Sequence, residues 1–140
     1  MPTTFRSDLV AAFSTIMAAF IVAHPTVVVR HFRHRPPNLA QPTPFTYLDL
    51  RPEAISHDHA LRTRLASPSI VLVDQWTEAG EVMDRLDDAV DLLLDTFTAN
   101  YSPVANSIWI GGMTITDEEI DGHPCVRFTF EDIEFKEGRQ

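Results

Sequence analysis

The chain has 140 residues, 44% of them hydrophobic, a formal net charge of −9 and a single cysteine, Cys125. This length predicts one domain spanning residues 1–140, large enough to bury a core. The lone cysteine excludes an internal disulfide framework, and the acidic balance argues against general nucleic-acid affinity, because phosphate binding depends on neutralising cations.

The N-terminal apolar run, residues 9–23, has the composition of a membrane segment but is too short for a comfortable span. It also lacks the basic start and the small-residue cleavage site of a signal peptide. We therefore expect a buried helix over residues 6–23 and no membrane partner. Because the helix is apolar nearly all round, both the sheet and a neighbouring subunit are candidates to cover it.

The next segment predicts two strands with a proline-rich loop between them. Residues 26–32 and 45–50 are interpreted as a hairpin, joined across residues 35–44, which hold four prolines. Residues 30–37 read RHFRHRPP and carry charge on both faces of a strand, so they do not fit a core. We expect a hairpin or loop around residues 30–46 to project from the domain.

The middle of the chain contains one strand and the clearest helix. Residues 51–66 are polar and are expected to be mostly irregular, whereas the apolar run 69–76 fits a central strand. After Thr77, a plausible N-cap, apolar residues recur at three- and four-residue steps and predict a long helix. These apolar positions are Val82, Leu86, Ala89, Val90, Leu93 and Phe97.

Two further strands, at residues 107–119 and 124–135, are joined by a turn at Asp121-Gly122. The order α-β-β-β-α-β-β predicts an α/β fold of the α+β kind. It consists of a single mixed, mostly antiparallel sheet of about five strands, packed by two helices. The second helix is expected to connect the third and fourth strands in a right-handed crossover.

Two groups of residues are candidate metal ligands. His57 and His59 place two imidazoles on one side of an extended segment, but no third or fourth ligand accompanies them. Residues 117–122 match the start of a calcium loop, but Phe128 stands where that loop needs a bidentate glutamate. Surface histidines and a hairpin turn explain both groups, so we predict no metal, and the role of His57 and His59 stays open.

Signatures of catalysis are missing from the sequence. It has no G-x-S-x-G elbow and no phosphate-binding glycine loop, and Cys125 lies in an apolar strand, where a buried thiol is inert. By elimination we predict that the chain is no enzyme, binds no cofactor, and works as an assembly or interaction protein.

Charge is divided unevenly along the chain. Residues 1–70 hold seven Lys/Arg and four Asp/Glu, whereas residues 71–140 hold four and sixteen. Copies of such a chain can associate basic side to acidic side. The candidate interface combines the arginines of residues 30–35 with aspartates that recur on a second face of the long helix, for which a solvated face is the alternative. These residues are Arg30, Arg33, Arg35, Asp84, Asp88, Asp91 and Asp95.

The second half of the chain resembles a known family. The run LRTRLASPSIVLVDQW, the helix EVMDRLDDAVDLLLDTFTANYS and the segment SIWIGGMTITDEEIDGHPCVRFTFEDIEFKEGR look like those of a tail terminator protein of long-tailed (siphovirus-type) bacteriophages. The resemblance covers most of the chain and is strongest over residues 61–139.

The resemblance implies a virion structural protein that closes into a ring, typically a hexamer. The ring caps the tail tube, stops its elongation and provides the surface that joins the head. The implied partners are further copies of the chain, the tail tube protein and a head–tail connector protein, with DNA only in transit through the ring. Assembly in the host cytoplasm and a place at the head-proximal end of the tail are also implied.

Three alternatives stay open from the sequence. The first is another head–tail connector or tail-completion protein. The second is a small binding or regulatory module that works as a monomer or dimer. The third is an enzyme or metalloprotein built on the histidines or aspartates. A native mass measurement distinguishes a ring from the second alternative, and metal analysis tests the third.

Overall fold

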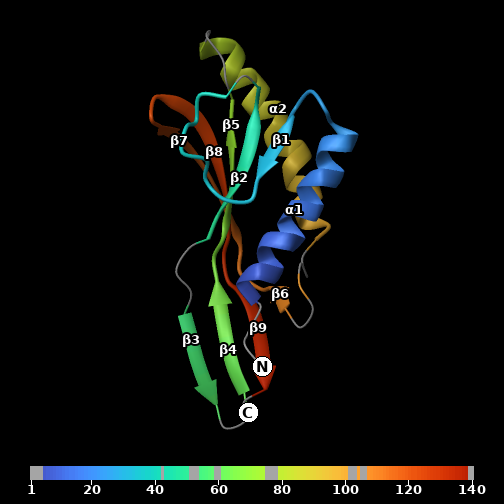
Figure 1. Ribbon diagram of the computed structural model, residues 1–140, viewed down its shortest axis with the longest axis vertical. Helices are drawn as coiled ribbons and strands as arrows, with labels where there is room; N and C mark the ends of the chain where they lie inside the picture. The colour runs from blue at the N-terminus through green and yellow to red at the C-terminus, as the bar shows by residue number, and fades with distance from the viewer. Residues whose placement is uncertain are drawn as a thin grey trace.

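The computed structural model describes residues 5–41, 43–50, 54–58, 61–74, 79–100, 104 and 107–138. Two helices and nine strands follow one another in these parts of the chain (Figure 1). Their bounds are α1 (Phe5–Ala23), β1 (Arg30–Phe32), β2 (Phe45–Asp49), β3 (Ala54–Asp58), β4 (Leu61–Ala66), β5 (Ser69–Val73), α2 (Ala79–Thr98), β6 (Ser107–Trp109), β7 (Met113–Ile120), β8 (His123–Phe130) and β9 (Ile133–Gly138).

The strands form two sheets. The larger sheet has five strands in the order β1-β2-β5-β8-β7, and the smaller has four in the order β3-β4-β9-β6. All pairs are antiparallel except β1 with β2. Since β5 and β7 are both antiparallel to β8, they run parallel to each other, as expected for strands connected through a helix. The predicted class, α+β with a mixed, mostly antiparallel five-stranded sheet and two helices, is confirmed, but the sheet is not single, because β3, β4, β9 and β6 form a second sheet.

A long two-stranded ribbon joins the two sheets. Strand β4 leads almost directly into β5, and β8 into β9, so the smaller sheet extends below the larger one in Figure 1. The ribbon breaks where Asp132 adopts a left-handed conformation, with φ of 61°. At the break the amide of Phe130 donates to the Pro68 carbonyl over 2.9 Å, and the amide of Asp132 donates to Ser67 Oγ over 3.2 Å.

The main core lies on one face of the larger sheet, which we call the helix-covered face. Alternation along the strands puts Leu48, Ile70 and Phe128 on this face, where both helices pack against them. Phe97 of α2 makes edge contacts with Phe128 and Phe130, with ring centroids 5.4 and 4.9 Å apart. The same alternation places Val126, Phe128 and Phe130 on one side of their strand.

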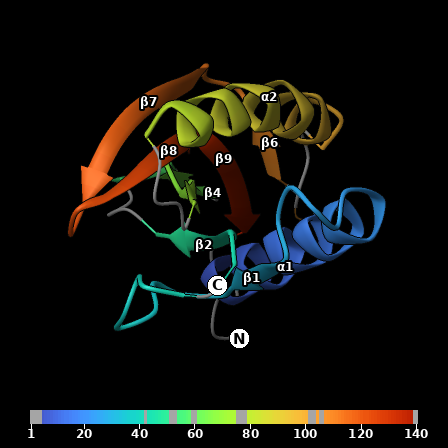
Figure 2. The same ribbon diagram turned by 90° about the horizontal axis from the view of Figure 1, so that it is seen from above.

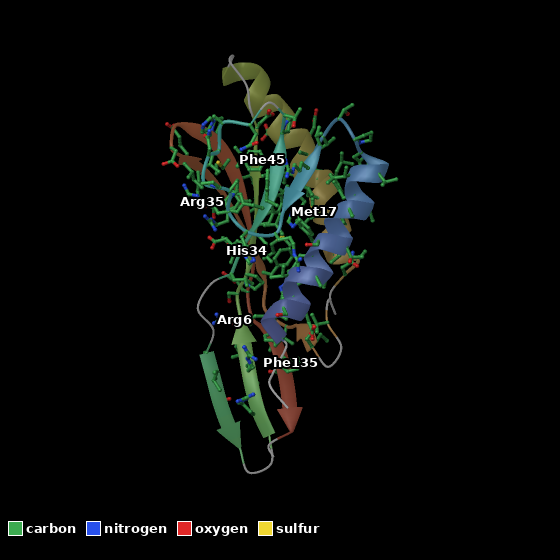
Figure 3. The ribbon with its side chains drawn as sticks, viewed as in Figure 1. Arg6, Met17, His34, Arg35, Phe45 and Phe135 are labelled. Carbon is green, nitrogen blue, oxygen red and sulfur yellow. The ribbon has the colours of Figure 1, made fainter. Side chains whose placement is uncertain are left out.

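Helix α1 is long and apolar enough, by length and composition alone, to cross a membrane, a test that core helices also pass. Its large side chains face the core, and Met17 lies between the helix and the sheet in Figure 3. Small residues such as Ala11, Ala18 and Ala23 remain exposed on the opposite side. The predicted helix over residues 6–23 is therefore a core helix that is open on one side. Its six buried residues are Phe5, Leu9, Val10, Phe13, Met17 and Phe20.

Two predictions for the first half were wrong. Strands β1 and β2 do not form a hairpin: they run parallel, with Arg30 opposite Phe45, because the chain crosses the sheet between them. Residues 51–66 are not irregular, since β3 and β4 pair as a hairpin. That hairpin escaped prediction because Ala54, Ile55 and Ser56 are all exposed, so no alternation of apolar and polar residues marks the strand.

The two predicted C-terminal strands are confirmed, but each of them is divided into two strands. The expected strand 107–119 is two strands, β6 and β7, in different sheets, and the expected strand 124–135 is divided into β8 and β9 at Glu131 and Asp132. The turn at Asp121-Gly122 is confirmed: φ is 51° and 81° at these residues, the positive values that a two-residue hairpin turn requires.

Candidate protein-interaction surfaces

The basic segment, residues 30–35, begins on an edge strand. Arg30 is exposed, and its guanidinium carbon lies 4.3 Å from the ring centre of Phe32, two residues further along the same face of β1. The Phe32 ring in turn meets Phe45 edge-on at 5.3 Å. This stacking holds the Arg30 guanidinium over the Phe32 ring, and Arg30 makes no ion pair with the described residues. Arg33 and His34 follow in the loop and are exposed.

His31 lies between Arg30 and Phe32 in β1, and its side chain points to the opposite face of the sheet. Its Nδ1 lies 2.8 Å from Thr46 Oγ1, on the helix-covered face, and its Nε2 is buried with no hydrogen-bond partner in the described part of the chain. Burial lowers the pKa of His31 to about 4, so the ring is neutral at pH 7. His31 therefore belongs to the helix-covered face, half-buried, and takes no part in the exposed basic surface.

Arg35 is bound within its own chain. Its Nη2 lies 2.8 Å from Asp121 Oδ2 in the turn between β7 and β8, and both side chains are more than half exposed. The loop that carries Arg35 was expected to project. Instead, Pro36 and Leu39 are buried, and Leu39 packs with Phe45 against the sheet face opposite the helices. We call this second face the outer face.

The acidic stripe, Asp88, Asp91 and Asp95, runs along the solvent side of α2. All three are exposed, while Ala89, Leu93 and other residues between them are buried in the core. Within the described residues none of the three makes an ion pair. Asp84 belongs to α2, but its side chain lies outside the described part.

The acidic stripe and the basic segment are on different sides of the subunit. Figure 2 shows α2 along one side, and β1 with the loop after it along the opposite side. The fold therefore brings none of the described α2 aspartate side chains to Arg30 or Arg33, and Arg35 has Asp121 as its partner instead. Both surfaces are left available for another molecule.

A buried charge cluster on the outer face was missed by the sequence analysis. The side chain of Arg127 is only 11% exposed, and it donates from Nη1 to Asp49 over 2.7 Å and from Nε to Glu118 over 2.6 Å. Burial by itself would lower the pKa of Arg127, but these two bonds raise it, so the charge is fixed. The cluster ties β2, β8 and β7 together. The only sign of this cluster in the sequence is Arg127 itself, a charged residue that lies within the apolar, alternating strand β8.

The candidate metal ligands gain no support from the structure. His57 lies in β3, but its side chain and the whole of His59 are outside the described residues. The supposed calcium loop is strand β7 and its tight turn, a geometry that does not wrap around an ion. Over the part of the chain that was searched, no three His, Cys, Asp or Glu side chains cluster in a way that could hold a metal.

Two hollows open beside the helices. One, of about 300 Å³, lies between the C-terminal halves of α1 and α2 and is lined by Ile16, Ala19 and Thr96 among others. The other, of about 170 Å³, lies near Val27 and Leu72, with Asp74 and Asp88 at its wall. Among the described residues that line them, neither hollow combines a nucleophile, a base and an orienting group.

No protein-family model matches the chain, and no curated protein sequence matches it significantly.

Proposed function

We propose that this chain is a structural assembly protein of a bacteriophage tail, a tail terminator whose copies associate head to tail into a ring. The ring would cap the tail tube, stop its elongation and offer the surface that joins the head. The observation that supports this proposal most is the pair of unsatisfied, oppositely charged surfaces on different sides of one subunit.

Head-to-tail association needs two different patches that complement each other. The basic segment supplies Arg30 and Arg33, which have no ion pair in the described residues, and the acidic stripe supplies three free carboxylates. Arginine suits such a contact, because its planar guanidinium pairs with carboxylates in a fixed geometry. A neighbour's stripe that docks on the basic segment would satisfy both surfaces at once.

Free strand edges add to the support. Strand β3 is one edge of the smaller sheet, and β7, with eight residues, is one edge of the larger sheet. Unpaired backbone groups along an edge favour pairing with another chain. Exposed Ile108 and Ile110, 42% and 56% accessible, lie at the opposite edge of the smaller sheet. These features are typical of a subunit that is completed by its neighbours.

The test is the state of association of the purified chain, alone and with tail tube protein. Native mass spectrometry and electron microscopy should reveal closed rings, and tubes incubated with the protein should carry a ring at one end and stop growing. A species that stays monomeric in both conditions would contradict the proposal. Ring formation without any effect on tubes would favour a different head–tail connector.

A further inference from the structure

The loop of residues 34–44, of which the structure describes all but residue 42, is the feature of the fold that the proposed function leaves unused. This loop, which we call the strap, crosses the outer face of the larger sheet between β1 and β2 (Figure 1). Beneath it lie side chains that are almost completely buried although no helix covers them. They are Phe45, Tyr47, Val71, Val73 and Cys125, with exposures of 0 to 2%.

One side chain at the tip of the strap closes this face. Leu39 is 3% exposed and packs into the apolar cluster of the outer face. The turn that presents it is built from local bonds: the Ala40 amide donates to Asn38 Oδ1 over 2.9 Å, and the Gln41 amide donates to the Leu39 carbonyl over 3.0 Å. Both of these bonds lie within the tip, so the tip keeps them when it leaves the sheet.

One exposed ion pair fastens the strap to the far side of the sheet. Arg35 reaches across to Asp121 in the β7–β8 turn, with 51% and 71% of the two side chains exposed. In Figure 3 the strap residues Arg35 and His34 lie on the side of the sheet away from α1. An exposed pair such as this is weak and open to competition by other charges.

We propose that the strap is a releasable cover: an acidic protein surface that binds the basic segment takes Arg35 from Asp121, and Leu39 then leaves the outer face. Arg30 and Arg33, which are exposed beside the strap, give such a surface its first contacts. Release uncovers an apolar sheet face only when a partner is present, so the free subunit stays soluble. The inference concerns the free chain and does not depend on ring formation.

The reactivity of the single cysteine measures whether the strap covers the outer face. Cys125 Sγ lies under the strap, bonded to the His123 carbonyl at 3.2 Å, and it is the only thiol in the chain. Labelling with a disulfide reagent such as DTNB therefore measures how often the strap opens. Arg35→Ala should speed labelling about two- to fivefold, the factor that an exposed ion pair contributes. Leu39→Ala should speed labelling about tenfold or more, because the side chain that covers the outer face is itself truncated.

Two control variants separate strap opening from unfolding of the whole domain. Lys136→Ala removes another exposed cation and its ion pair, with Glu134 on β9, away from the strap, and should label like the unaltered chain. Leu48→Ala weakens the helix-covered face and the domain as a whole, and should change labelling only as far as it changes the unfolding equilibrium measured in urea. If Arg35→Ala labels at the rate of Lys136→Ala, or if every rate tracks global stability alone, the cover is not releasable.

The role of an acidic partner needs its own measurement. Poly-L-glutamate, compared with sodium chloride at equal ionic strength, should accelerate labelling of Cys125 in the unaltered chain. It should add little to Arg35→Ala, where the ion pair is already absent. Equal effects of the polymer and the salt, or no acceleration by the polymer, would overturn release by acidic surfaces.

Discussion

The two faces of the five-stranded sheet are closed in different ways. The helix-covered face is sealed by α1 and α2 with interlocking aromatic rings, such as Phe97 between Phe128 and Phe130. The outer face is sealed by one leucine on a loop and by a buried ion cluster around Arg127. The first arrangement is redundant, because many side chains support each other. The second depends on a few contacts, each of which can be removed singly.

This difference predicts that the largest loss of stability comes from the helix-covered face. Phe128→Ala should lower the free energy of unfolding by about 3–5 kcal/mol, because Phe97 and its neighbours cannot fill the space. Val71→Ala, equally buried on the outer face, should lower it by about 2 kcal/mol or less, since the strap can settle into the space. Urea unfolding measures both, and equal losses would show that the two faces are equally rigid.

A pH titration tests the helix-covered face at its edge. The pKa of His31 is lowered by burial to about 4, so the folded state binds fewer protons than the unfolded state between about pH 6.5 and pH 4. His31 should contribute fully to stability above pH 6.5 and lose up to about 3 kcal/mol as the pH falls to 4. The histidine is partly accessible, so the loss is smaller if water enters.

The control for this titration is the neighbouring exposed histidine. His31→Asn should flatten the fall in stability between pH 6.5 and 4, whereas His34→Asn should leave the curve unchanged. Superimposable curves for His31→Asn and the unaltered chain would show that His31 is solvated in solution.

The ion cluster tests the outer face. Arg127→Met keeps an unbranched apolar stem but leaves Asp49 and Glu118 without their partner, which should lower the free energy of unfolding by about 2 kcal/mol. The effect is moderate because the two carboxylates remain 39% and 30% exposed and can be hydrated. Adding Asp49→Asn to Arg127→Met should recover part of the loss. A double variant whose loss is the simple sum would show that the two residues do not interact.

A glycine pair tests the border where the helix-covered face meets the second sheet. A Cβ on Gly111 would collide with the backbone carbonyl of Glu131, whereas one on Gly112 would lie at an ordinary contact distance, 3.9 Å, from Glu131 Oε2. Gly111→Ala should therefore lower stability by about 1–2 kcal/mol and shift Trp109, whose ring meets Phe130 at 5.4 Å. Gly112→Ala should change little. Tryptophan fluorescence and urea unfolding compare the two variants. Equal stability and equal fluorescence would show that the backbone around Gly111 can shift to admit a side chain.

The sequence predicted the helix-covered face better than the rest of the molecule. Periodic apolar residues in α2 and strict alternation in β8 result from packing between neighbouring elements, and they are visible along the chain. The β3–β4 hairpin left no such pattern, because the described residues of β3 are exposed. The parallel pairing of β1 with β2 depends on how a loop crosses the sheet, and local propensity does not encode that path.

The sequence predicted that residues of the candidate interface are exposed, but it did not predict which charged residues pair within the fold. Exposure of Arg30, Arg33 and the acidic stripe follows from helix and strand periods. The partner of Arg35 does not, since Asp121 lies 86 residues away, and neither does the pairing of Arg127 with Asp49, 78 residues apart. These contacts depend on the order of the strands in the sheet, so no local sequence motif predicts them.

Charge exchange between copies tests the central claim most directly. Arg30→Glu with Arg33→Glu, and separately Asp91→Arg with Asp95→Arg, should each prevent rings in native mass spectrometry, while Lys136→Glu, an exposed control, should not. The two double variants mixed should associate with each other, and a chain carrying all four changes should close again. Rings that form equally well from each double variant alone would contradict a contact between the basic segment and the acidic stripe.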